Sequence, residues 1–127
     1  MARIFTSFAM EDKSLRDLLV GQRHNTRNAI EFTDYSVKVP WETKWKTNCR
    51  ERIRLCSGVI GIITGSTSQA EGQLWELRCA IDEQKPVLLI HGYSNLLLRA
   101  SAPPPFMRGH RIFDWTEANI VRFIDSL

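Results

Sequence analysis

The sequence predicts an α/β fold: a flavodoxin-like, doubly wound sheet of about five parallel strands with helices on both faces. Short apolar or β-branched segments alternate with amphipathic, helix-forming segments along the chain. Residues 59–64 and 87–90 are apolar without polar alternation, which is typical of inner parallel strands covered on both faces. The 127 residues, 43% of them hydrophobic, suit one domain with a sizeable core. We therefore expect a single domain over residues 1–127 with right-handed crossovers.

The N-terminal part is predicted to contain two strands separated by a helix. Residues 3–8 form a β-branched and aromatic run that predicts the first strand, and Glu11 and Asp12 begin the helix. The helix is expected to turn three leucines inward: Leu15, Leu18 and Leu19. Residues 29–33 are short and half polar, which favours a second strand at the edge of the sheet.

A loop over residues 34–40 leads to a second helix, predicted from about residue 42 to residue 56. Helical spacing defines its buried side as Trp45, Cys49, Ile53 and Cys56. Its outer face is basic and carries Lys46, Arg50 and Arg54 at every fourth position. A solvated face is the first interpretation of this stripe, and a site for an anion or a partner is the second.

The central helix is predicted over residues 68–83, between a third strand at residues 59–64 and a fourth at residues 87–91. Helical spacing assigns its sheet-facing stripe to Leu74, Leu77 and Ile81. Ala80 lies beside this stripe and Glu76 lies off it. Glu76 falls within the first two turns, near the carboxyl ends of the strands, where open α/β sheets bind their ligands.

The C-terminal part is predicted to complete the sheet. One or two helical turns are expected around residues 96–98, and residues 111–115 form the last strand. Thr116, followed by Glu117, is a suitable cap for a final helix. The sheet-facing residues of that helix are expected to be Ile120, Phe123, Ile124 and Leu127.

Composition and charge limit the classes of function. A formal charge of +3 and a pI near 9.0 favour anionic ligands such as nucleotides, without requiring nucleic acid. No apolar run reaches the length of a membrane span and no signal-peptide pattern opens the chain, so we expect a cytoplasmic protein without membrane contact. The odd set of cysteines, Cys49, Cys56 and Cys79, indicates buried reduced thiols.

Several common site motifs do not occur in the sequence. The three histidines do not combine with the cysteines at a zinc-binding spacing, so no metal is predicted. Gly58, Gly61 and Gly65 match neither a Rossmann fingerprint nor a P-loop, and there is no nucleophile elbow. Hydride transfer, phosphoryl transfer and serine hydrolysis are therefore not favoured.

Several short segments follow one another in an order typical of a known family. They are Ile4-Phe5-Thr6-Ser7-Phe8 with Glu11-Asp12, Asp34-Tyr35-Ser36, Ile53-Arg54-Leu55-Cys56-Ser57, the strand from Val59 to Thr64, and Ser68 with Trp75-Glu76-Leu77 and Ala80. In this order and spacing the chain resembles a TIR-like domain over residues 3–91. More narrowly, it is similar to the stand-alone bacterial TIR-like proteins of the Thoeris antiphage defence type.

The resemblance implies cleavage of NAD at the nicotinamide–ribose bond, in some members followed by cyclisation to a signalling form of ADP-ribose. NAD is then a substrate, and no resident cofactor is implied. The resemblance also implies self-association or a TIR-like or effector protein as partner, and it maps the catalytic glutamate onto Glu76. A carboxylate suits the reaction because it stabilises oxocarbenium character on the ribose, and nicotinamide departs as a neutral group that needs no acid.

Four further residues carry over from the resemblance as candidates for substrate binding: Ser7, Phe8, Asp34 and Trp75. Each also has a structural interpretation. Ser7 and Phe8 are equally suited to packing at the end of a strand, and Asp34 to a turn bonded to its own backbone. Trp75 is better suited to covering the sheet edge or an interface than to stacking on a ligand, and Glu76 itself also suits a solvated helix face.

Two other functions remain open alongside NAD cleavage. A non-catalytic TIR-like interaction module would tolerate changes at Glu76 but would need surface residues such as Trp41 or Trp45. A nucleoside deoxyribosyltransferase-like enzyme would share the architecture and a catalytic glutamate, but it would exchange nucleosides and ignore NAD.

Overall fold

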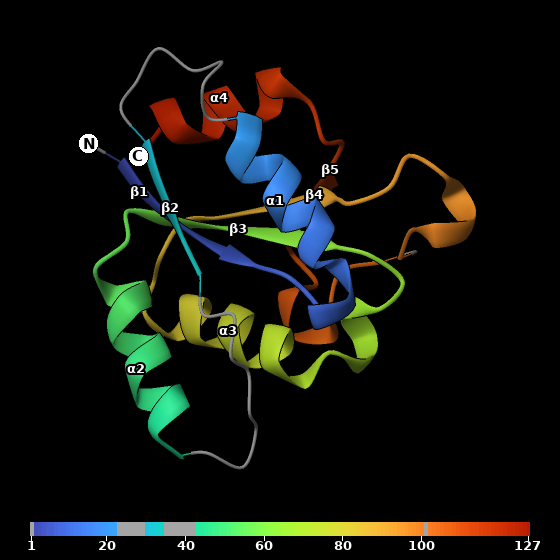
Figure 1. Cartoon of the computed structure of the whole chain (residues 1–127). Coiled ribbons are helices and arrows are strands. Elements are labelled where there is room, and N and C mark those ends of the chain that lie inside the picture. Colours follow the sequence, from blue (N-terminus) through green and yellow to red (C-terminus); the bar gives the residue numbers. More distant parts are fainter. Residues whose placement is uncertain (1, 23–29, 35–42, 101) are drawn as a thin grey trace.

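A five-stranded, all-parallel sheet forms the centre of the molecule in the computed structural model, which describes residues 2–22, 30–34, 43–100 and 102–127 (Figure 1). The strands are β1 (Ala2–Ser7), β2 (Ile30–Thr33), β3 (Gly58–Ile63), β4 (Val87–His91) and β5 (Ile112–Phe113). Their spatial order is β2-β1-β3-β4-β5, which is the flavodoxin-like order. The predicted fold class is therefore confirmed, as is the edge position of the second strand.

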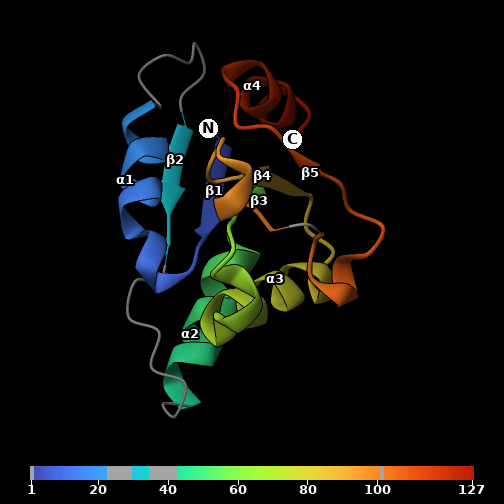
Figure 2. The same cartoon turned by 90° about the vertical axis from the view of Figure 1, so that its right-hand side faces the viewer.

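The helices divide between the two faces of the sheet. They are α1 (Lys13–Gly21), α2 (Thr43–Arg54), α3 (Glu71–Asp82) and α4 (Glu117–Asp125). The chain also forms short 3-10 turns: η1 (Met10–Asp12), η3 (Thr67–Gln69), η4 (Leu96–Leu98) and η5 (Pro105–Met107). α1 and α4 cover one face, and α2 and α3 cover the other (Figures 1 and 2). The helix predicted from residue 68 thus starts as a 3-10 turn and becomes α-helical at Glu71, while the predicted loop beyond Asp34 falls outside the described residues.

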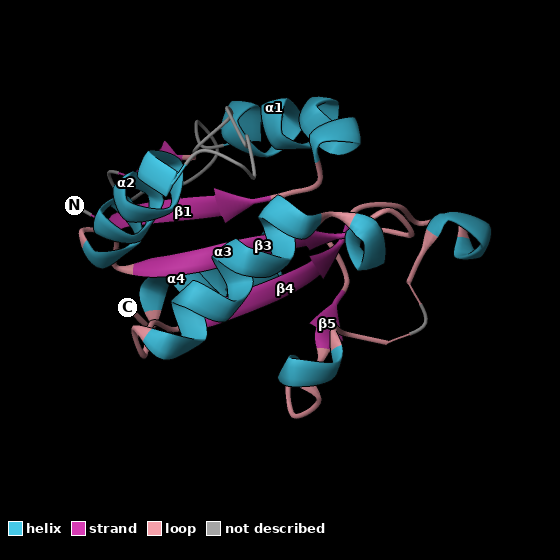
Figure 3. Ribbon diagram, turned by 90° about the horizontal axis from the view of Figure 1, so that it is seen from below, coloured by secondary structure: helices cyan, strands magenta, loops and turns pink. Residues whose placement is uncertain are grey.

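Each face of the sheet has its own core. Phe5, Val59 and Ile63 pack with residues of α2 and α3, whereas Ile4, Ile60 and Ile62 pack with residues of α1 and α4. Successive strand residues point to opposite faces, so β1 and β3 supply both cores. This is why their sequences are continuously apolar. From the α2 and α3 side, α3 lies across β3 and β4 (Figure 3).

The buried sides of three helices test the predicted patterns. The predicted side of α2 is confirmed, since Trp45, Cys49, Ile53 and Cys56 are all buried. The α1 prediction was wrong for Leu18, which is 54% exposed, because Leu15 and Leu19, one helical turn apart, are the leucines that pack on the sheet. In α4 the predicted sheet-facing residues are confirmed: Ile120 and Ile124 are buried, and the side chains of Phe123 and Leu127 lie against Gly58 of β3, although Leu127 follows the helix end and is 38% exposed.

The predicted cap of the last helix is confirmed, because the Thr116 hydroxyl oxygen accepts a hydrogen bond of 3.1 Å from the Asn119 amide. None of the helices built from described residues combines the length and apolar character that crossing a membrane requires.

All three cysteine thiols should resist modification in the folded protein. Cys49, Cys56 and Cys79 are buried, as predicted. Burial raises the pKa of Cys56 to about 11 and also raises the pKa of Cys79, so little reactive thiolate forms at pH 8. We expect an aromatic disulfide reagent to react slowly with native protein and rapidly with all three thiols in denaturant. Rapid reaction without denaturant would contradict the buried positions.

Candidate functional site

One face of α3 brings polar side chains into the interior. Gln73, Glu76, Leu77 and Ala80 follow helical spacing, and all four are buried. The stripe predicted from the sequence was therefore partly wrong. Leu77 and Ala80 do face the sheet, but Leu74 and Ile81 are only half-buried, and Glu76 lies within the buried face instead of off it.

The Glu76 carboxyl group lies against the end of β1. It has no exposed surface, and its Oε1 accepts a hydrogen bond of 2.8 Å from the Ser7 hydroxyl. Cys49 of α2 approaches the other oxygen, with its Sγ 3.9 Å from Oε2. The structure thus brings Glu76 and Ser7 together, as the resemblance implied, and excludes the interpretation of Glu76 as a solvated surface residue.

Gln73 is a site residue that the sequence interpretation missed. Its amide nitrogen donates to the Ser7 carbonyl at 3.2 Å and to the Ile62 carbonyl at 2.7 Å. These carbonyls belong to β1 and β3, the neighbours between which the strand order reverses, and ligands of doubly wound sheets bind at this point. Its buried Oε1 has no hydrogen-bond partner among the described residues. The spacing of Gln73, Glu76, Leu77 and Ala80 was the signal that could have identified it.

A hollow of about 250 Å³ opens beside these groups. It is lined by Met10 and Glu11 of the turn after β1 and by residues 69–73 at the start of α3. Gln73 belongs both to this wall and to the hydrogen bonds around Ser7. The hollow therefore lies at the carboxyl edge of the sheet, next to the buried hydrogen bonds between Gln73 and Ser7.

Asp12 is a second buried acid at the same edge. Its Oδ2 accepts a 2.6 Å hydrogen bond from the Thr64 hydroxyl, whose oxygen in turn accepts one from the Ser66 amide. The Thr67 hydroxyl oxygen accepts from the Thr64 amide at 3.0 Å. These bonds tie the turn after β1 to the turn after β3, so they hold the edge at which Glu76 lies.

Phe8 and Asp34 each have structural partners of their own. Phe8 is buried in the core under α1 and α4, with the Arg16 guanidinium 5.4 Å from its ring centre. Asp34 forms an ion pair with Arg16, and its carbonyl accepts from Arg52 at 2.5 Å. Burial lowers the pKa of Arg16, but the hydrogen bond and charge of Asp34 outweigh this and raise it above its ordinary value. Asp34 thus anchors the end of β2 to α1.

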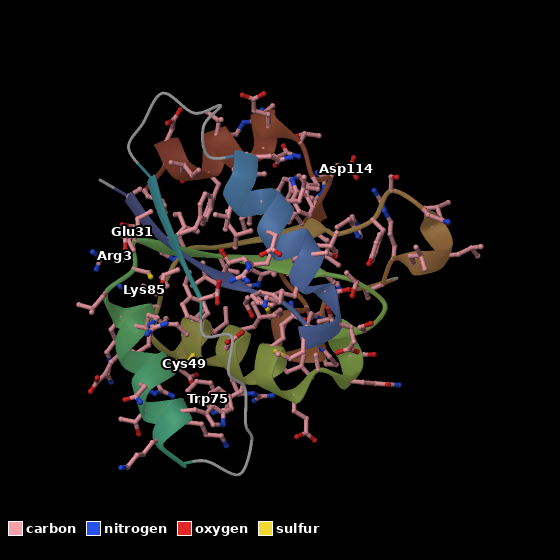
Figure 4. The ribbon with its side chains drawn as sticks, in the orientation of Figure 1. Arg3, Glu31, Cys49, Trp75, Lys85 and Asp114 are labelled. Atoms are coloured by element: carbon pink, nitrogen blue, oxygen red, sulfur yellow. The ribbon has the colours of Figure 1, made fainter. Side chains whose placement is uncertain are left out.

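Trp75 packs between α2 and α3. Its ring meets the Trp45 ring edge-on, with centroids 5.2 Å apart, and the Arg50 guanidinium lies 5.6 Å from the Trp75 ring centre. Figure 4 shows Trp75 and Cys49 on the same side of the sheet. The Trp75 ring therefore lies in a contact between α2 and α3 of the same chain. Trp45, which the interaction-module hypothesis treated as a surface residue, is 2% exposed, and Trp41 lies outside the described residues.

The basic stripe on α2 is partly neutralised by Glu83. Arg50 and Arg54 reach the two carboxyl oxygens of Glu83 at 2.7 and 3.0 Å. The hydrogen bonds from Arg54 and Arg50 lower the pKa of Glu83. Lys46 remains exposed. The stripe therefore links α2 to the end of α3.

Across the described ranges, no three side chains of His, Cys, Asp or Glu gather so that they could hold a metal ion. No protein-family model and no curated protein matches the sequence.

Replacing Ser7 with alanine should destabilise the protein by about 1 to 3 kcal/mol, because it removes the hydroxyl donor from a buried carboxyl group. The control is Thr6→Val on the preceding residue. The Thr6 hydroxyl is also buried but has no hydrogen-bond partner among the described residues, so its loss should be nearly neutral or stabilising. Urea denaturation measures both changes. Equal effects of the two variants would show that the Ser7–Glu76 bond contributes nothing.

Proposed function

We propose that this protein is a TIR-like enzyme that cleaves NAD at the nicotinamide–ribose bond, with Glu76 as its catalytic carboxylate. The observation that carries the proposal is the buried Glu76 carboxyl group beside Ser7, at the edge where β1 and β3 separate. The resemblance to TIR-like proteins of the Thoeris type extends the proposal to a role in antiphage signalling.

The chemistry requires one well-positioned anion. The bond between the ribose C1′ and the nicotinamide nitrogen breaks with its electron pair passing to nicotinamide, which leaves as a neutral molecule. Positive charge develops on the ribose, and the Glu76 carboxylate stabilises it. At this interior position little solvent would screen a charge on the Glu76 carboxyl group. Water then adds to C1′ and releases a proton, or an adenine nitrogen adds instead and closes a cyclic product.

The proposal also requires a change on substrate binding. Glu76 has no exposed surface, so the ribose reaches it only when the groups that cover it move. The hollow bounded by Gln73 offers the approach, and the Gln73 Oε1 offers an acceptor for a ribose hydroxyl.

The test is nicotinamide release from NAD by the native protein at high concentration, compared with the Glu76→Gln variant. Chromatography of the products separates ADP-ribose from its cyclic form. Release by the native protein and its loss in the variant would support the proposal. If the native protein releases no nicotinamide, even when its self-association is induced, the result would contradict the proposal.

A specific observation favours the interaction module as a second candidate. Leu96, Leu97 and Leu98 form the projecting turn η4 and are 79%, 91% and 47% exposed (Figure 1). Three adjacent exposed leucines are a feature of contact surfaces. Under this alternative, Glu76→Gln would leave the protein's function unchanged. Exchange of nucleosides without NAD cleavage would instead indicate the deoxyribosyltransferase-like reaction.

A further inference from the structure

A second and larger hollow, of about 540 Å³, lies at the carboxyl ends of β4 and β5. Its polar and aromatic lining includes Gln22, His91, Tyr93, Arg99, Asp114 and Trp115. The volume falls within the range of small-molecule sites in proteins. Leu18, the leucine of α1 that turns away from the core, lines the same hollow.

Hydrogen bonds hold the lining side chains in position. The Arg99 Nε donates to the Tyr93 carbonyl at 2.5 Å, and its Nη2 lies 3.3 Å from the Asp114 carboxylate. The Trp115 indole donates to the Gln22 side-chain oxygen at 2.9 Å. A cation and an aromatic ring are therefore oriented before any ligand binds, which reduces the entropy lost on binding.

His91 is an uncharged part of the lining of the hollow. Burial lowers its pKa, and the nearby charge of Arg99 lowers it further. Its Nδ1 is buried and has no hydrogen-bond partner among the described residues. The charge balance of the hollow thus depends mainly on Arg99 and Asp114.

These two charges are not equivalent. The Asp114 side chain is 70% exposed and that of Arg99 only 22%, so the carboxylate can turn into solvent while the guanidinium stays in the wall. Exposed ion pairs are weak, and a phosphate makes stronger, forked hydrogen bonds with a guanidinium. An anionic ligand can therefore displace Asp114 from Arg99.

We propose that this hollow binds a nucleotide of about the size of a nucleoside monophosphate. Its phosphate pairs with Arg99, and its flat base stacks on the part of the half-buried Trp115 ring that faces the hollow. A protein of formal charge +3 favours such an anion.

This site is separate from that of Glu76. Trp115 packs with the core under α1 and α4, whereas Glu76 belongs to α3 on the opposite face. Figure 4 shows Asp114 on the other side of the sheet from Cys49, the neighbour of Glu76. The proposal consequently does not depend on NAD cleavage.

Titration calorimetry with adenosine monophosphate and with adenosine tests the proposal. The monophosphate should bind the native protein on the order of tenfold more tightly than adenosine. Arg99→Gln should remove this difference, and Arg99→Lys should restore only part of it because lysine lacks the fork. Asp114→Asn should tighten monophosphate binding several-fold, since it removes the internal competitor. The exposed Arg108, away from the hollow, provides the control Arg108→Gln with native affinity.

The sign of the Asp114→Asn effect is decisive. Weaker monophosphate binding in this variant would overturn the proposal, as would native affinity in a folded Arg99→Gln variant. Circular dichroism verifies the fold of each protein. Glu76→Gln should bind the monophosphate as the native protein does, and loss of binding in that variant would assign the nucleotide to the other site and overturn the inference.

Discussion

Glutamine in place of Glu76 should reduce nicotinamide release roughly a hundredfold or more while the fold is retained. The side-chain oxygen of glutamine still accepts the hydrogen bond from Ser7, so the 2.8 Å contact survives. Only the charge is lost, and the charge is what stabilises the developing cation on the ribose. The measurement is the initial rate of nicotinamide release, with thermal unfolding recorded for both proteins.

The matched control is Glu51→Gln on α2, because it makes the same chemical change at an exposed position. This variant should release nicotinamide at the native rate. If both variants retain the native rate, Glu76 has a structural role only. If both lose activity equally, the assay reports the change in net charge of the protein and not the chemistry of the site.

Truncation of Trp45 to alanine should lower the free energy of unfolding by about 3 to 5 kcal/mol. Trp45 is 2% exposed, belongs to the core between the sheet and α2 and α3, and contacts the Trp75 ring. Its removal leaves a cavity that rigid neighbours fill only in part. Urea denaturation followed by circular dichroism measures the loss.

Trp45→Phe is the graded comparison, because phenylalanine refills most of the space and should cost clearly less than alanine. A change below about 1 kcal/mol for Trp45→Ala would contradict the core position of Trp45. The result also affects functional tests. If the Trp45→Ala variant no longer binds a partner protein, the cause would be unfolding and not the loss of a surface contact. Trp45 therefore cannot test the interaction-module hypothesis.

Local patterns were sufficient to predict most of the architecture. Continuous apolar runs identified β3 and β4 as inner strands, and helical spacing identified the buried side of α2, because both follow from backbone periodicity and the removal of apolar surface from water. The same rule failed where polar residues are buried. Gln73 and Glu76 occupy sheet-facing positions of α3, but residue type alone favoured Leu74 and Ile81.

In the candidate site, too, the sequence determined some features and the tertiary structure decided the others. The sequence alone determined the parallel α/β fold, the edge position of β2 and the location of Glu76 near the start of the helix after β3. The tertiary structure alone decided that Ser7 bonds to both Glu76 and Gln73, that Phe8 joins the opposite core, that Asp34 pairs with Arg16, and that Trp75 packs on Trp45. The physical reason is that these contacts join residues distant in the sequence, and their partners are set by the faces that strands and helices present to each other after packing.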